Sequence, residues 1–258
     1  MLRHRLLITA LLALPFAGPA AAQSLDEIVA RYTAARGGLS AWQAVQTMEW
    51  TGSYSTFSKV FPFTLQWQRP SSYRFESVTL GGPFLWAQDK DGPWWIFSTF
   101  EILTPARTDG PYKPMLVRQA ELEPPLLDWQ AKGHQLEWVG KGDIDGNPTL
   151  DLKLTLKGGG QEVWHLDATT YLEFAVDSTI FDFTQTDKPL GKRAFFSNWK
   201  KVESVMLPLR IEEEYGARFA LMVIEKATIN PKLDPALFVM PVVEPKPAEK
   251  AEEKPAGG

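Results

Sequence analysis

The clearest alternation of apolar and polar residues in the chain runs from Thr149 to Lys157. Leucine occupies every second position from Leu150 to Leu156, and threonine, aspartate or lysine fills the positions between them. This period of two is typical of a β-strand with one buried and one solvent-exposed face. We expect the strand to be shared by two hairpins, because Asp145-Gly146-Asn147 precedes it and Gly158-Gly159-Gly160 follows it.

Similar patterns predict strands along most of the chain. The period changes to two at Thr47, after which Met48, Trp50 and Tyr54 share one face. Further strands are expected at residues 61–67, 73–77, 84–87, 94–97, 136–138, 162–166, 173–183, 193–202, 207–215 and 218–229. About ten or eleven consecutive antiparallel strands with few helices indicate one twisted sheet that curls on itself. The predicted fold is mainly β, an incomplete, half-open antiparallel β-barrel with short helices forming a lid.

Helical patterns are short and few. Ser24-Leu25-Asp26-Glu27 is typical of a capping box, and the helix that it begins should end at Gly37-Gly38. A second short helix is expected from Ser40, with Gln43 in the reciprocal capping position. Between residues 104 and 133 five prolines interrupt the pattern, and two short helices are expected, at 115–122 and 126–131. Long insertions of this kind are lids, binding loops or inert Ω-loops.

The two ends of the chain differ from the middle. Residues 1–22 combine a basic start, an apolar run and Ala20-Ala21-Ala22, and so predict a secretory signal peptide. Residues 244–258 contain no large apolar side chain and predict a disordered tail. One domain is therefore expected at residues 23–243, exported to the periplasm. Cysteine is absent, so neither a lipid anchor at the cleavage point nor a disulfide is expected.

Composition narrows the function further. The formal net charge is −4 and the basic residues form no stripe, which argues against binding nucleic acid or docking electrostatically on anionic lipid. Beyond the signal peptide, no apolar run approaches the roughly 20 residues of a membrane helix. The chain contains 10 Trp, 15 Phe and 6 Tyr. These aromatic residues predict either a well-packed core or an aromatic-lined ligand cavity.

Residues that could perform catalysis are scarce. His165 and Asp167 lie two apart on an expected strand and could form a hydrogen-bonded pair, which leaves a hydrolase as a remote alternative. His134 and His165 are otherwise expected at the surface or in turns, and no G-x-S-x-G or H-E-x-x-H sequence occurs. Asp143 to Asn147 resembles the start of a calcium loop, but its glycine comes too early and Leu154 stands where a glutamate is needed. A tight turn is the better interpretation, and no enzyme activity, metal or cofactor is expected.

Several stretches together resemble a known family. Residues 67–74, WQRPSSYR, and 91–95, DGPWW, resemble the R-P turn and D-G turn of the periplasmic lipoprotein carriers of the LolA family. Further matching pieces resemble the broader LolA-like group of outer-membrane lipoprotein-sorting proteins: Ala35–Leu39, Asp128–His134, Leu166–Leu172, Phe196–Trp199, Leu207-Pro208 and Asn230–Pro241. The resemblance spans about residues 25–241.

The resemblance implies a half-barrel whose concave apolar face receives lipid chains without catalysis. The expected function is a soluble periplasmic carrier or chaperone that holds acyl chains for transfer to the outer membrane. Its expected partners are a lipid or acylated lipoprotein and possible inner- or outer-membrane envelope proteins, and a monomer is expected. The alternative is a non-enzymatic regulatory or scaffold protein that binds another envelope protein or senses lipid. Arg69 corresponds by position to the R-P arginine of the carriers. The candidate ligand-binding residues are Trp67, Arg69, Tyr73, Phe75, Trp86, Trp95, Phe97, Trp138, Leu152, Leu154 and Trp164.

Overall fold

The computed structural model describes residues 23–56, 58–182 and 185–242. The expected signal peptide and tail lie outside the described residues, so both remain predictions. The strands are β1 Thr47–Thr56, β2 Lys59–Gln68, β3 Ser72–Thr79, β4 Gly82–Asp89, β5 Gly92–Phe97, β6 Ile102–Arg107, β7 Gln135–Ile144, β8 Asn147–Thr155, β9 Gln161–Asp167, β10 Glu173–Asp182, β11 Gln185–Val202, β12 Val205–Tyr215 and β13 Arg218–Ile229. The helices are α1 Leu25–Ala35, α2 Leu39–Ala44 and α3 Tyr112–Gln119, with 3₁₀ turns η1 Ser98–Phe100 and η2 Pro235–Phe238.

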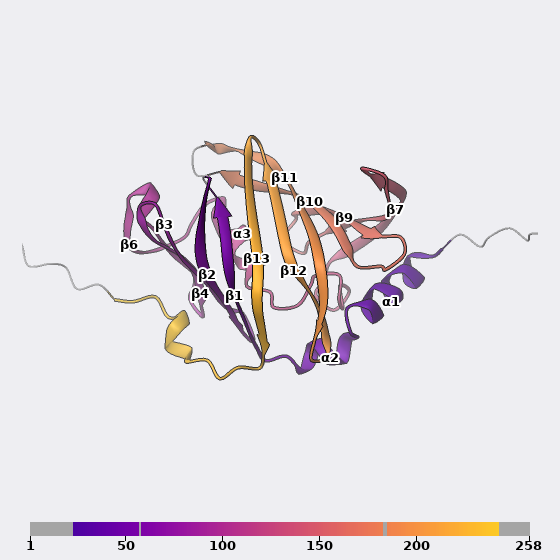
Figure 1. The fold of residues 1–258 in the computed structure, drawn as a ribbon, viewed down its shortest axis with the longest axis horizontal. Coiled ribbons are helices and arrows are strands. Elements are labelled where there is room, and N and C mark those ends of the chain that lie inside the picture. Colours follow the sequence, from indigo (N-terminus) through magenta and orange to yellow (C-terminus); the bar gives the residue numbers. More distant parts are fainter. Residues whose placement is uncertain (1–22, 57, 183–184, 243–258) are drawn as a thin grey trace, which may run out of the picture.

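Within the described residues, thirteen strands form one antiparallel sheet in the order β6-β5-β4-β3-β2-β1-β13-β12-β11-β10-β9-β8-β7. The edge strands β6 and β7 do not pair with each other, so the sheet curls without closing (Figure 1). This is the incomplete barrel that the alternating pattern predicts. The expected number of strands, ten or eleven, is too low, and one of the missed strands is β6, which lies where Pro105 and its neighbours obscure the alternation.

The two halves of the barrel meet at β1, which pairs with both β2 and the last strand, β13. The register shifts between Thr51 and Gly52, which is a β-bulge. A Cβ atom at Gly52 would collide with the backbone carbonyl oxygen of Val223. Glycine at this position therefore allows β13 to approach β1 closely at the centre of the sheet.

The expected hairpin at the Leu150–Leu156 alternation is confirmed. Asp145 and Gly146 both have positive φ, 52° and 82°, which is typical of a type I′ turn. The Asp143 carboxylate accepts a hydrogen bond from the Gly146 amide at 2.8 Å, so this acidic cluster is a tight turn, as predicted. In β8 the Leu150, Leu152 and Leu154 side chains are at most 2% exposed.

The helices follow the sequence signals only in part. Ser24 caps α1 as predicted, since its hydroxyl accepts a hydrogen bond from the Glu27 amide. The expected start of α2 at Ser40 is wrong, because the helix begins at Leu39 after Gly38. The expected helix at 126–131 is also wrong: this stretch forms turns. Helix α3 begins at Tyr112, three positions before the expected start. None of the described helices has the length and apolar character needed to cross a bilayer.

Residues 235–240 lie against β3 to β5, on the face opposite the barrel interior. Trp94 donates its indole N–H to the carbonyl oxygen of Phe238 at 2.8 Å, and Arg74 donates to that of Leu237 at 3.0 Å. The Met240 amide donates to Asp89 at 3.0 Å. This segment covers a small outer apolar cluster that includes Trp94 and Leu85. The other face of these strands remains directed at the interior.

Candidate functional site

The concave face of the sheet surrounds a cavity of about 360 Å³ between β1 to β5 on one side and β10 to β13 on the other. Aromatic side chains dominate its lining: Trp50, Tyr54, Trp67, Tyr73, Phe75, Phe84, Trp86, Phe97 and Phe100. Neighbouring rings are in contact. Trp50 and Trp67 meet edge to face with centroids 5.0 Å apart, and Phe84 stacks on Phe97 at 4.2 Å. These rings support one another, so they form a continuous apolar wall.

Five of the eleven residues predicted from the sequence line this cavity: Trp67, Tyr73, Phe75, Trp86 and Phe97. All five lie on β2 to β5, where the period of two correctly predicts which residues share a face. The cavity also has lining residues that were not predicted, including Trp50 and Tyr54 on β1, Phe84 on β4 and several residues of β10 to β13. Trp50 and Tyr54 could have been included, because their shared face is visible in the sequence.

The other six predicted residues lie outside the cavity. Leu152, Leu154 and Trp164 belong to the filled part of the core, in which Leu126 and Leu127 are also fully buried, and Trp138 packs against that core. Trp95 packs against Tyr112 of α3, with ring centroids 5.4 Å apart. Arg69 lies beside α2. The concave face is thus filled by the protein's own side chains over β7 to β9 and hollow over β1 to β5.

Helix α3 is tied to one end of the cavity through its last residue, Gln119, which also lines it. Trp67 donates its indole N–H to the Gln119 carbonyl oxygen at 3.0 Å, and the Tyr73 hydroxyl donates to its side-chain oxygen at 3.1 Å. Burial raises the pKa of Tyr73, so its phenol remains a donor at neutral pH. Two wall residues therefore hold α3 across this end.

Residues 120–133, here called the cover segment, continue from α3 and are joined to the barrel by Arg69. The Arg69 guanidinium donates to the carbonyl oxygens of Val45 and Trp42 at 2.8 and 3.0 Å and to Glu123 at 2.7 Å. Lys132 lies 3.4 Å from the other oxygen of Glu123. One arginine therefore links the end of α2 to the cover segment. Helix α3 and the cover segment together form the lid.

Replacing Arg69 with alanine is expected to loosen the cover segment. Glu123 would lose its main cation and the carbonyl oxygens of Trp42 and Val45, at the end of α2, would lose a donor, a loss of roughly 1–3 kcal/mol in a partly buried setting. Backbone amides of residues 120–133 should then exchange with deuterium about tenfold faster, while those of β8 and β9 remain protected. Arg210→Ala is the matched control, because Arg210 forms a salt bridge with Glu212 at the surface and does not contact the cover segment among the described residues. Unchanged exchange in the cover segment of Arg69→Ala would contradict this role.

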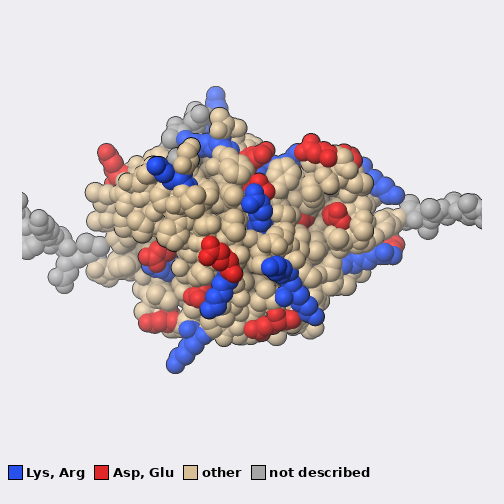
Figure 2. All heavy atoms as spheres, in the orientation of Figure 1, with Lys and Arg blue, Asp and Glu red and all other residues tan. Residues whose placement is uncertain are grey.

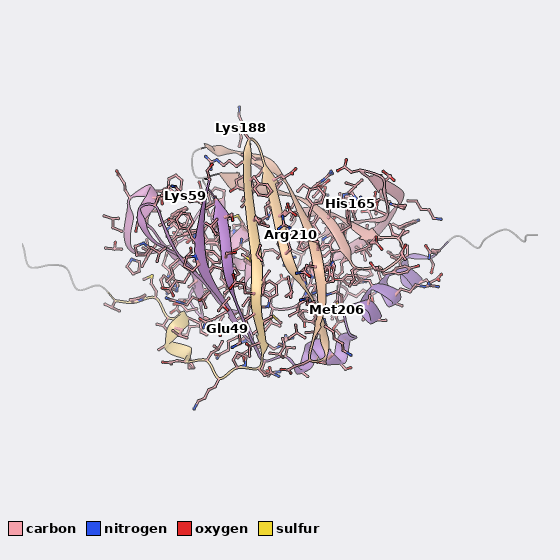
Figure 3. All side chains as sticks on the ribbon, in the orientation of Figure 1. Glu49, Lys59, His165, Lys188, Met206 and Arg210 are labelled. Carbon is pink, nitrogen blue, oxygen red and sulfur yellow. The ribbon has the colours of Figure 1, made fainter. Side chains whose placement is uncertain are left out.

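The opposite end of the cavity lies at the tips of the β1–β2 and β12–β13 hairpins. Thr56 and Arg218 line both the cavity and a second hollow of about 400 Å³, to which Lys59, Val60 and Phe219 contribute. The Val60 and Phe219 side chains are 68% and 47% exposed. Figure 3 places Lys59 and Lys188 at this tip end and Glu49 and Met206 at the other end. Among the described residues, the cavity is therefore bounded by α3 at one end and adjoins this second hollow at the hairpin tips.

Polar side chains concentrate near the tips. Lys192 donates to Glu213 at 2.8 Å, and both line the cavity. Burial raises the pKa of Tyr54, and the nearby Tyr215 and Glu213 raise it further. On the outer face, Figure 2 shows acidic and basic side chains interspersed, without a large patch of one sign. The cavity therefore has an aromatic wall with a polar end, and the outer face seen in Figure 2 carries charges of both signs.

The expected pair of His165 and Asp167 does not form. The His165 Nδ1 lies 2.8 Å from Asp151 and its Nε2 lies 3.3 Å from Asp177, while Asp167 accepts hydrogen bonds from the amides of two turn residues. His165 is only 8% exposed, so its expected surface position is also wrong. His134 does lie in a turn, where it accepts a hydrogen bond from the Lys157 amide at 3.1 Å. His165 thus belongs to a row of hydrogen-bonded side chains across neighbouring strands, Asp151–His165–Asp177–Arg193, on the face opposite Trp164.

Three carboxylates, those of Asp89, Glu123 and Asp177, form ion pairs with arginines, and these pairs predict a loss of stability in acid. Two hydrogen bonds from Arg193 lower the pKa of Asp177. Burial alone would raise the pKa values of Asp89 and Glu123, but Arg107 and Arg69 respectively hold them below the usual range. Because the folded pKa values are lowered, their contribution is complete above the unfolded values of about 3.9 for Asp and 4.3 for Glu and is lost as the pH falls through the folded values.

The contribution of these three carboxylates to the urea midpoint is therefore expected to stay level from pH 7 to about pH 5 and to fall steadily between about pH 4.5 and pH 2.5. Urea titrations followed by tryptophan fluorescence at half-unit pH steps would measure this. A midpoint that stays constant down to pH 3 would contradict the assignment.

The described residues include no group of three or more His, Cys, Asp or Glu side chains placed to hold a metal ion. No protein-family model and no curated protein matches this sequence. Solved structures do match the fold. A DUF1329 family protein from Desulfovibrio piger has a TM-score of 0.54 at 14% identity, over 83% of this chain and 97% of that chain.

Two further solved structures also match the fold, and their names refer to the LolA superfamily or to lipoprotein sorting. A LolA superfamily protein from Nitrosomonas europaea has a TM-score of 0.53 at 10% identity, over 84% of this chain and 98% of that one. The chain has a LolA-like fold. A domain from Vibrio parahaemolyticus, named for outer-membrane lipoprotein sorting, has a TM-score of 0.52 at 14% identity, over 82% and 94% of the two chains. At such identities the similarity supports the LolA-like fold alone, so the function must be argued from the cavity.

Proposed function

We propose that this protein is a non-enzymatic periplasmic carrier that holds an acyl chain of a lipid or lipoprotein in its cavity for transfer to the outer membrane. The observation that carries the proposal is the aromatic-walled cavity of about 360 Å³, bounded by α3 at one end and adjoining a second hollow at the other. Ligand sites in proteins span roughly 300–1,000 Å³, and this cavity lies within that range.

The energetics favour such a container. Burying hydrocarbon is worth about 0.8 kcal/mol per CH₂, so a sixteen-carbon chain crosses water only at a cost of roughly 12 kcal/mol. A carrier must therefore replace water along most of the chain. Side chains of Trp50, Trp67, Phe75, Phe84 and Trp86 can do so without offering a strong polar competitor. Export to the periplasm is part of the proposal and rests on the pattern of residues 1–22. The name of the Vibrio domain is consistent with lipoprotein cargo.

Native mass spectrometry of the exported protein, purified from its own envelope without detergent, tests the proposal. A discrete lipid or acylated peptide bound at near one-to-one, and released by denaturing extraction, is the expected result. A ligand-free mass that persists after lipid is added would contradict it. In that case a stable complex with another envelope protein would favour the scaffold alternative.

A further inference from the structure

Among the described residues, the charged side chains that line the cavity lie at one end. They are Lys192, Glu213 and Arg218, on the adjacent strands β11, β12 and β13. Gln119 and the aromatic wall surround the opposite, covered end. A cavity with this asymmetry suits a ligand that is apolar over most of its length and polar at one terminus.

The three strands place two cations on either side of a phenol. Lys192 is directly opposite Tyr215 in the β11–β12 register, and Tyr215 is directly opposite Arg218 in the β12–β13 register. Directly opposed residues have Cβ atoms about 5 Å apart, so the three form a row roughly 10 Å long. All three line the cavity. Lys192 also donates to Glu213 at 2.8 Å, so among the described side chains the row and its neighbour contribute two cations and one carboxylate.

We propose that the ligand is a single-chain amphiphile with an anionic head group, held with its head at the Lys192–Tyr215–Arg218 row and its chain along the aromatic wall. This inference rests on the proposed function, because it assigns the ligand class of the same cavity. A carboxylate or phosphate head accepts charge-assisted hydrogen bonds from lysine and arginine, and the tyrosine hydroxyl can donate as well. A cationic head would meet two like charges at the same place.

The dimensions of the cavity also indicate how long the bound acyl chain is and how many acyl chains the cavity holds. Lining residues on β1 run from Trp50 to Thr56, and six steps of about 3.3 Å give a length of roughly 20 Å. An extended chain of tetrahedral bonds advances about 1.2 Å per bond, so roughly sixteen carbons span this length. A volume of about 360 Å³ is near the lower end of the range for ligand sites, which favours one chain over two or three.

The test compares two ligands that share a chain and differ in head charge: palmitate and its uncharged methyl ester. The delipidated protein is titrated with each at pH 8, and binding is followed by tryptophan fluorescence. The expected result is that palmitate binds about tenfold tighter or more, because its head gains hydrogen bonds to charged partners. In the double variant Lys192→Gln, Arg218→Gln, the ratio of the two affinities should fall to about one.

The matched control is the double variant Lys188→Gln, Lys226→Gln. It removes the same charge, but neither residue lines the cavity or the second hollow, and Figure 3 places Lys188 at the same end of the molecule. It should keep the wild-type preference for palmitate. As a second variant, Glu213→Gln removes the carboxylate that competes for Lys192, so it should raise the affinity for palmitate several-fold and not that for the ester.

Equal affinities of the wild-type protein for palmitate and its ester would overturn the head-group assignment and leave the carrier function standing. A preference that survives in the Lys192→Gln, Arg218→Gln variant would likewise overturn it. If neither ligand binds, the proposed function fails together with the inference.

Discussion

Replacing Ala220 with tryptophan is expected to weaken binding of a sixteen-carbon acyl chain by about 100-fold or more. Ala220 lies on β13, lines the cavity and is 2% exposed. An indole added here has to occupy part of the 360 Å³ that the chain would use. Excluding about four methylene groups removes roughly 3 kcal/mol at ~0.8 kcal/mol each, which is about two powers of ten in affinity.

The matched control is Ala131→Trp, an equal increase in size at an exposed position of the cover segment. It should bind the chain as the wild-type protein does. Both variants should remain folded, since the cavity can accept the new ring and overpacking costs about 1–3 kcal/mol. Fluorescence titration with palmitate measures the effect, and circular dichroism verifies the fold. Wild-type affinity in Ala220→Trp would show that the chain binds elsewhere.

Replacing Glu173 with alanine is expected to lower the free energy of unfolding by about 3–5 kcal/mol, the usual cost of removing one partner from a buried ion pair. Glu173 and Arg36 are 3% and 4% exposed and form a salt bridge. The same carboxylate oxygen accepts the Tyr32 hydroxyl at 2.7 Å. The Arg36 guanidinium also lies 5.0 Å from the ring centroids of both Trp42 and Trp199. Without Glu173, the arginine would remain buried among rings without a carboxylate.

The control for this variant is Lys153→Ala, because Lys153 and Glu137 form a more exposed pair at 3.6 Å. Its expected cost is about 0–1 kcal/mol. Urea denaturation followed by far-ultraviolet circular dichroism gives both values. A loss below about 1 kcal/mol for Glu173→Ala would mean that Arg36 finds another partner or water, and that this pair does not hold α1 against β10.

The sequence predicts elements well where a local pattern is sufficient. The alternation around Leu152, the turn at Asp145-Gly146 and the Ser24 cap each depend on residues within a few positions of one another, and each appears in the structure as expected. Strand β6 is missed because Pro105 masks its alternation. The start of α2 is misplaced because Gly38, with no capping side chain, stands at its N-cap.

The cavity is less predictable, because it depends on which strands meet. The alternation with a period of two correctly indicates that Leu152 and Trp67 are both buried. It does not show that other side chains fill the space around Leu152, whereas the space beside Trp67 remains a cavity. The Lys192–Tyr215–Arg218 row exists only through the registers of three strands. The partner of His165 is mispredicted for the same reason. Asp151 lies opposite it on the neighbouring strand β8, whereas the predicted partner Asp167 lies on the same strand, β9. A search for pairs within one strand could not find either group.

The most direct test of the account is a crystal structure of the delipidated protein saturated with 16-bromohexadecanoate, in which anomalous scattering locates the end of the chain. The account predicts one bromine position inside the cavity, at the covered end beside Trp50, Trp67 and Gln119. Bromine on the outer face, or crystals in which the cavity contains no ligand at saturating concentration, would contradict it.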